Sequence, residues 1–167
     1  PLEELAEGFA QLFRPRAAAA FNESGLELPG VVARCAVKGQ NASRAPGWTT
    51  TKPAVAGFAA SSSGAAGDYN HYRSTAMGAT ADRALSILTG DVVDALQREG
   101  WPVGDGDLGE NVLVENFPYG AFRVGGLYQL GDTVVEITEP IAPCAFLCTL
   151  PYLAERWRCQ DFVRTLN

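Results

Sequence analysis

Cys144 is the residue of this chain whose type and setting point most directly to chemistry. It stands in the stretch Ile137-Thr-Glu-Pro-Ile-Ala-Pro-Cys-Ala-Phe-Leu-Cys148, behind Pro140 and Pro143. Proline has no backbone N–H and a fixed φ, so the two prolines end strand pairing and hold the backbone before the thiol in a defined path. A thiol presented in this way could act as a nucleophile, a sulfur carrier or a soft-metal ligand, because thiolate is the reactive form.

A packing role accounts for Cys144 equally well, because free cysteines often serve as small apolar core residues. A structural zinc site is a weaker alternative, since Cys144 and Cys148 form a single C-x3-C pair and such sites usually contain two tight pairs. Cys148 is interpreted as a packing residue. The four cysteines are sparse, which favours a reducing, intracellular setting over a disulfide scaffold.

A second cluster, Gly67-Asp-Tyr-Asn-His-Tyr-Arg73, contains the single histidine of the chain. Asp68, His71 and Arg73 bring a carboxylate, an imidazole and a guanidinium close together. A lone histidine is more often a structural hydrogen-bonding residue than a catalyst. Arg73 and Arg83 could hold a phosphate group bidentately, although each arginine alone says little.

A third cluster, Leu108-Gly-Glu-Asn-Val-Leu113, places Glu110 and Asn111 directly before a hydrophobic strand. Gly109 permits a tight approach of the backbone at this point. Taken alone, the cluster is best interpreted as a polar turn that leads into the strand. The order of the three clusters along the chain favours a functional role for this third cluster.

Short elements must position these clusters. Helical spacing of apolar residues predicts a short helix from Leu2 to Phe13, and a second helix follows Thr89, its N-cap, and stops at Gly100. Val92, Val93 and Leu96 should face inward from that second helix. A further helix is expected over 152–166, strands over 31–38, 54–58, 83–88, 111–115, 123–130 and 133–138, and a tight turn at Gly131-Asp132.

The composition favours one β-rich domain. The chain has 167 residues with 18 glycines and 10 prolines, a content typical of many short elements joined by turns. We expect a helix and connector over residues 1–29 and the folded domain over 30–167.

The net charge of −6 gives no general attraction to nucleic acid or anionic membranes, and no apolar run is long enough for a membrane span. Because the chain begins at Pro1, we expect a trimmed or processed product that has lost any targeting peptide.

The clusters, read in order, resemble the MOSC domain family, named for the C-terminal domain of molybdenum cofactor sulfurase. The similarity covers roughly Gly30 to the C-terminus. Its most specific parts are Gly109-Glu-Asn111 and the Pro143-Cys144 that follows a terminal strand. The loop Asn70-His71-Tyr72-Arg73 departs from the His-His-Gly-Gly-like turn of many relatives, and many relatives also continue beyond the position of Asn167.

The resemblance implies a β-rich α+β fold, a MOSC-like β-barrel with a few peripheral helices. It also implies that Cys144 ligates molybdenum in the molybdenum cofactor, beside the pterin dithiolene. The other site residues that it implies are His71 and Asp68 as catalytic residues and Lys38, Arg73, Arg83, Glu110 and Asn111 as cofactor-binding residues.

The activity implied by the resemblance is that of an oxidoreductase which removes oxygen from small N-hydroxylated substrates. The chain contains no flavin, haem or iron–sulfur module, so a reductase would need a separate electron-donor protein. Two alternatives stay open: a sulfur-carrier or cofactor-carrier domain without catalysis, and a non-catalytic binding module with core cysteines. The family also carries an association with pyridoxal phosphate binding.

Overall fold

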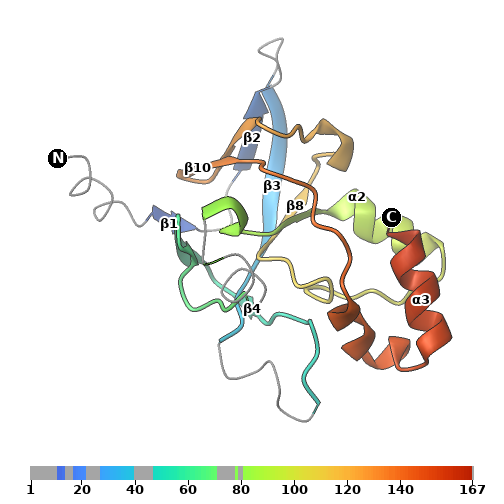
Figure 1. The fold of residues 1–167 in the computed structure, drawn as a ribbon. Helices are drawn as coiled ribbons and strands as arrows, with labels where there is room; N and C mark the ends of the chain where they lie inside the picture. Colours follow the sequence, from blue (N-terminus) through green and yellow to red (C-terminus); the bar gives the residue numbers. More distant parts are fainter. Residues whose placement is uncertain are drawn as a thin grey trace.

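The computed structural model describes residues 11–13, 17–21, 27–39, 47–70, 78 and 81–166. Its strands form two sheets, and α2 and α3 lie together on one side of the larger sheet, away from β1 (Figure 1). The larger sheet has the order β10-β9-β2-β3-β8-β7, with β4 paired to β3, and the smaller has the order β1-β5-β6. The chain is therefore a sheet-rich α+β protein, as predicted. The described strands form open sheets, so the closed barrel stays a prediction.

The strands are short except for β3. They are β1 (Gln11–Phe13), β2 (Ala17–Phe21), β3 (Glu27–Ala36), β4 (Ala54–Val55), β5 (Phe58–Ser61), β6 (Gly64–Ala65), β7 (Ile87–Thr89), β8 (Val112–Glu115), β9 (Leu127–Leu130) and β10 (Thr133–Glu136). The helices are α2 (Gly90–Arg98) and α3 (Arg156–Thr165), with 3-10 turns η2 (Ala81–Arg83), η3 (Tyr119–Ala121), η4 (Ala145–Thr149) and η5 (Pro151–Leu153). No helix in the described ranges is long and apolar enough to cross a membrane.

The N-terminal residues correct one prediction. Gln11–Phe13, expected to end a helix, form β1, which pairs antiparallel with β5; residues 2–10 of the predicted helix lie outside the described part. Pairing with a neighbouring strand overrides a helical spacing of apolar residues, because propensity is a weak prior against tertiary contacts. Ala17–Phe21, for which the sequence predicted no element, form β2 between β3 and β9.

A β-bulge interrupts β3 where it pairs with β8. Val32 lies opposite Val114, but Arg34 lies opposite Leu113, so Ala33 is one residue more than the partner strand has. Val32 and Cys35 are each 1% exposed, although an odd spacing of three would put them on opposite faces of a regular strand. The bulge resets the alternation, so both side chains enter the core.

Two hydrophobic clusters stabilise the fold. The first lies at the sheet and includes the contact between the rings of Phe117 and Tyr128, whose centroids are 6.0 Å apart. The second lies among α2, η4, η5 and α3, where Trp101 and Phe162 meet with ring centroids 5.0 Å apart. The chain after η4 thus packs on α2 rather than on the main sheet.

The helix α2 confirms the prediction that a helix follows Thr89. Leu96 is buried, and Val92 and Val93 pack against the second cluster. The side chain of Thr89 does not cap the helix: it is fully buried, makes no cap hydrogen bond, and its hydroxyl oxygen has no partner. Its backbone pairs with Val114 in the parallel β7–β8 ladder, so the residue belongs to the sheet as much as to the helix.

The hairpin of β9 and β10 leads the chain toward Cys144. Its turn contains Gly131 at φ 61°, a left-handed conformation that favours glycine, so the predicted Gly131-Asp132 turn is confirmed. The last strand ends at Glu136, and residues 137–144 contain no helix or strand. The prolines at 140 and 143 therefore lie in an irregular segment, as expected.

Candidate functional site

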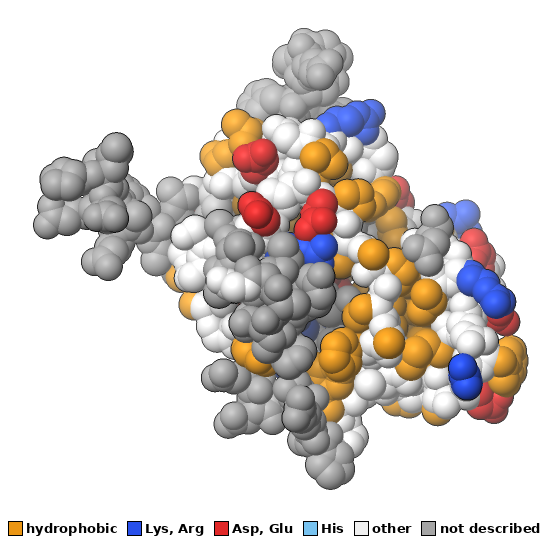
Figure 2. All heavy atoms as spheres, in the orientation of Figure 1, with side chains coloured by type: hydrophobic (Ala, Val, Ile, Leu, Met, Phe, Trp, Pro, Cys, Tyr) orange, Lys and Arg blue, Asp and Glu red, His pale blue; other side chains and the backbone are white. Residues whose placement is uncertain are grey.

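A large cavity of about 1370 Å³ lies between the sheet edge, α2 and the segment 137–144. Three of the predicted site residues, Arg83, Glu110 and Cys144, contribute to its walls. Hydrophobic side chains gather on the face that contains η4 and the segment before it, and acidic side chains lie above them (Figure 2). The volume exceeds that of a typical small-ligand pocket.

Cys144 presents a free, exposed thiol to this cavity. It directly precedes η4, and its carbonyl accepts a hydrogen bond from the Leu147 N–H at 3.1 Å. The alternative that Cys144 is a buried packing residue is therefore wrong. Cys35 fills that role: it is 1% exposed, and burial raises the pKa of its thiol.

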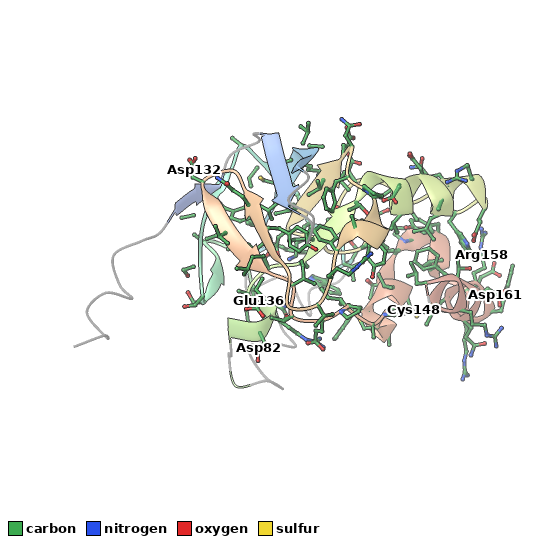
Figure 3. The ribbon with its side chains drawn as sticks, turned by 90° about the horizontal axis from the view of Figure 1, so that it is seen from above. Asp82, Asp132, Glu136, Cys148, Arg158 and Asp161 are labelled. Carbon is green, nitrogen blue, oxygen red and sulfur yellow. A yellow bond between two sulfur atoms is a disulfide. The ribbon has the colours of Figure 1, made fainter. Side chains whose placement is uncertain are left out.

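Cys148 is not a packing residue, because it forms a disulfide with Cys159. The bond joins η4 to α3, on the α3 side of the molecule in Figure 3. Cys148 is exposed and Cys159 is buried against Phe162 and its neighbours in the second cluster. The sparse cysteines thus include one disulfide-bonded pair, which the sequence did not predict.

Glu110 is a buried carboxyl, 4% exposed, at the wall of the cavity. Its Oε1 accepts from the Arg34 guanidinium at 3.1 Å and from the Gly106 N–H at 2.7 Å, whereas Oε2 has no partner. Burial raises the pKa of Glu110. Nearby backbone N–H groups and the positive charges of Arg34 and Lys52 oppose the rise. The turn predicted from the sequence thus contains a buried carboxyl group, that of Glu110, which Arg34 and Gly106 hold in place.

Gly106 is what allows this arrangement of charges. It has φ 83°, and a Cβ at this position would lie 2.5 Å from Nη2 of Arg34 and would also clash with the carbonyl oxygen of Lys52. Any side chain here would displace the arginine from Glu110. Gly109, predicted to permit a tight approach, also has a positive φ of 79°.

Asp68 and Lys38 lie next to this group of charges. Oδ2 of Asp68 pairs with Nζ of Lys52 at 2.8 Å, and Oδ1 accepts from the Lys38 N–H at 2.8 Å. Asp68 is therefore held on both oxygens. Burial lowers the pKa of Lys52, while the Asp68 charge opposes the change.

The ammonium group of Lys38 is also engaged. It donates to the carbonyl oxygens of Thr49 at 2.5 Å and Thr51 at 2.9 Å and lies 4.7 Å from the ring centroid of Trp48. Burial, followed by repulsion from Lys52, lowers its pKa. Lys38 thus binds the loop in front of β4, and neither it nor Asp68 is among the described residues that line the cavity.

Sequence reasoning missed the two cations that organise this group. Arg34 interrupts the β-branched run of β3, and a charge at that position was an available signal. Lys52 stands in a polar loop beside Pro53, where the sequence contains nothing to distinguish it. Its partner lies 16 residues away and is found only through the fold.

Arg83 lines the cavity with its guanidinium paired to Glu139, a residue of the same wall. The hydrogen bond from Arg83 is the main reason that the pKa of Glu139 lies below its ordinary value. Asp82 and Glu136 lie at the same end of the molecule (Figure 3). Arg83 is the one cation among the described lining residues, which include seven carboxylates: Asp82, Asp91, Glu99, Glu110, Asp132, Glu136 and Glu139.

Asn111 connects strands rather than lining the cavity. Its amide nitrogen donates to the Ala36 carbonyl at 3.1 Å, and its amide oxygen accepts from the N–H and hydroxyl of Ser86 at 3.2 and 3.0 Å. The side chain therefore joins the end of β3 to the residue before β7. His71 and Arg73, the remaining predicted site residues, lie outside the described residues.

The donor set can be tested against a molybdenum cofactor. An exposed thiol at the wall of a large cavity fits a soft metal, because thiolate is a soft ligand. The described residues contain no cluster of three or more His, Cys, Asp or Glu that would hold a metal without a cofactor. The residues therefore fit the metal end of such a cofactor at Cys144, and Arg83 is the cation of the described cavity wall that could meet its anionic end.

Comparison with known proteins identifies the family of the chain. No curated protein and no solved structure matches the chain. The family model of the MOSC domain matches residues 65–163, more than half of the chain, and this range contains Asp68, Glu110 and Cys144. The chain therefore belongs to the MOSC domain family, which is associated with the molybdenum cofactor.

Proposed function

We propose that this MOSC domain binds the molybdenum cofactor through the Cys144 thiolate and removes oxygen from small N-hydroxylated compounds. The observation that carries the proposal is the free thiol of Cys144 at the wall of a 1370 Å³ cavity in a MOSC domain. The bound cofactor would supply two-electron chemistry, with electrons from a separate donor protein. The protein would supply position and a sheltered cavity.

The residues around Cys144 have distinct tasks in this proposal. Pro143 and η4 hold the thiol on a fixed path, so its ligand atom needs little reorganisation. Arg83, oriented by Glu139, would contact the anionic part of the cofactor, together with Arg73. Lys38, Asp68 and Asn111 would brace the site through the backbone and side chains that they hold. His71 would line it.

Apolar side chains in the cavity would exclude water from the reacting group. Leu85, Ile87 and Ile137 line the cavity and also pack against the first hydrophobic cluster. A low local dielectric strengthens the interactions of nearby charges, among them Glu110.

The test is metal content. The chain is expressed in a host that makes the cofactor, and molybdenum and pterin are measured in the native protein, in Cys144→Ala and in Cys35→Ala. We expect molybdenum in the native protein and in the Cys35 variant, which lacks the other free thiol, and none in the Cys144 variant. Absence of molybdenum from native protein, or equal loading after loss of Cys144, contradicts the proposal.

The exposure of Cys144 also favours a second candidate, a sulfur carrier, because an accessible thiol can accept a persulfide. Mass spectrometry after exposure to a cysteine desulfurase separates the two functions. A cyanide-labile gain of one sulfur on Cys144 supports the carrier, and a metal-bound, unmodified thiol supports the enzyme.

Pyridoxal phosphate is not part of the proposal. This cofactor binds through a lysine amine, and the chain has two lysines, Lys38 and Lys52. Both ammonium groups are held by carbonyl oxygens or by Asp68, and neither is among the described residues of the cavity wall.

A further inference from the structure

Glu110 has one carboxylate oxygen that the protein satisfies and one that it does not. Oε1 has two donors, while Oε2 is buried without a hydrogen-bond partner. Leaving a buried polar atom unpaired costs about 1–3 kcal/mol, more for a charged group. Because Glu110 also lines the cavity, a group of a bound molecule could provide the missing partner.

Two cations and one backbone N–H approach the carboxyl of Glu110 from different parts of the chain. Arg34 approaches from β3, Lys52 from the loop before β4, and Gly106 offers its N–H from the turn before Glu110 itself. Lys52 is paired with Asp68. The carboxyl therefore faces one guanidinium directly, and the second cation is shared with another carboxylate.

We propose that Glu110 donates a proton from Oε2 to the oxygen of the compound that occupies the cavity. This inference rests on the proposed function, in which that compound is N-hydroxylated. Removing its oxygen as water consumes two electrons, which the reducing partner protein supplies, and two protons. Glu110 supplies one of these protons: the Oε2–H bond breaks, an O–H bond forms on the leaving oxygen, and the N–O bond breaks as the two electrons arrive. Solvent supplies the other proton, to the nitrogen, and a further solvent proton later restores the acid.

The surroundings fit both protonation states of the carboxyl. Before transfer, burial favours the neutral acid, which agrees with the direction of its pKa. After transfer, the carboxylate is held by Arg34 at 3.1 Å and by the Gly106 N–H at 2.7 Å. An acid whose pKa is moved toward neutral pH is the type that general acid catalysis uses.

The first test uses the metal-free native chain. Its infrared spectrum is recorded against pH, alongside Glu110→Gln and the control Glu115→Gln, which changes an exposed glutamate at the far end of β8. We expect a carboxylic acid C=O band that persists at pH values where exposed carboxyls are ionised. It should vanish in Glu110→Gln and remain in Glu115→Gln.

Isotope labelling keeps this test valid if Glu110→Gln fails to fold. Among glutamates whose side chains are described, Glu110 is the buried one, while Glu99, Glu115, Glu136, Glu139 and Glu155 are exposed. A ¹³C label in glutamate carboxyls should shift the persistent band of the native chain. Absence of the band, or a band that the label leaves in place, overturns the inference.

The second test uses the loaded enzyme and separates the two proposals. Glu110→Gln should keep its molybdenum, while kcat/KM for an N-hydroxylated substrate falls on the order of 100-fold and loses its decline at high pH. A variant that keeps both metal and full activity overturns the role of Glu110 and leaves the proposed function intact. A native chain that takes up no molybdenum overturns the proposed function, and the infrared band then decides the state of Glu110 separately.

Discussion

Cys148 and Cys159 are joined by a disulfide, and this bond ties the short helix behind Cys144 to α3. The two residues are 11 apart in sequence. A cross-link over a loop of this length stabilises a protein by about 3 kcal/mol, when the effect is assigned to a more restricted unfolded chain. The free thiol of Cys144 thus belongs to a segment that the disulfide anchors covalently at its far end.

Reduction of this disulfide should therefore destabilise the protein. We expect the free energy of unfolding to fall by about 3 kcal/mol in reductant, measured by urea denaturation. The variant Cys148→Ser/Cys159→Ser should start at the lower value and not respond to reductant. Four free thiols in unreduced, unfolded protein would contradict the bond.

Thiol labelling of the native protein should modify Cys144 and spare Cys35. Cys144 is exposed, whereas Cys35 is 1% exposed and its pKa is raised by burial, so its reactive thiolate is scarce as well as covered. Mass spectrometry should find one added label per native chain and none in Cys144→Ala. A second label of equal rate on Cys35 would contradict the buried position of its side chain on β3.

The ion pair of Lys52 and Asp68 should be costly to break on one side. Both side chains are at most 10% exposed, and an unpaired buried charge costs about 3–5 kcal/mol. We expect Lys52→Met and Asp68→Asn each to lower the free energy of unfolding by about this amount. The double variant should recover much of the loss, and additive losses would show that the two groups act independently.

Asn111→Ala should destabilise the fold by about 2–4 kcal/mol, because it leaves the Ala36 carbonyl and the Ser86 N–H without their partner. The control is Gln129→Ala, which removes an exposed amide from β9 and should cost less than about 0.5 kcal/mol. Urea denaturation measures both. A loss of cofactor binding in Asn111→Ala with unchanged stability would instead indicate direct contact with the cofactor.

Stability should depend on pH through Glu110. Its pKa in the folded protein lies above the ordinary value of 4.5, so the folded state binds the proton more tightly than the unfolded state does. The contribution is fully present below the unfolded pKa and is lost as pH rises through the folded pKa. The stability of the native chain relative to Glu110→Gln should therefore fall over that window, as measured by denaturation at a series of pH values. An upward slope would mean that Arg34 dominates.

Local patterns predicted much of the fold. Period-two alternation identified β10, and the apolar spacing after Thr89 identified α2, because in both cases one face of the element packs on a core. The same reasoning failed for Gln11–Phe13, where the partner strand is far away in sequence, since Gln11 pairs with Ala60. Non-local pairing leaves no trace in the short window from which the helix was predicted.

The candidate site could likewise be predicted only in part from local sequence. The sequence assigned Glu110 and Asn111 the same task, but Glu110 lines the cavity, while Asn111 bonds to the Ala36 carbonyl at the end of β3. The Cys148–Cys159 bond could not be predicted, because sequence spacing does not determine which cysteines approach each other in the fold.

The bulge at Ala33 also determines where this protein tolerates a change in length. Ala33 is exposed and has no partner residue in β8. The residues on either side of it, Val32 and Arg34, pair with Val114 and Leu113, which are adjacent in sequence. Removing Ala33 would leave a regular strand with Val32 and Cys35 still in the core and Arg34 still on the side of Glu110. Removing a residue from a regular part of β3 would instead exchange the two faces and direct the guanidinium into the apolar layer.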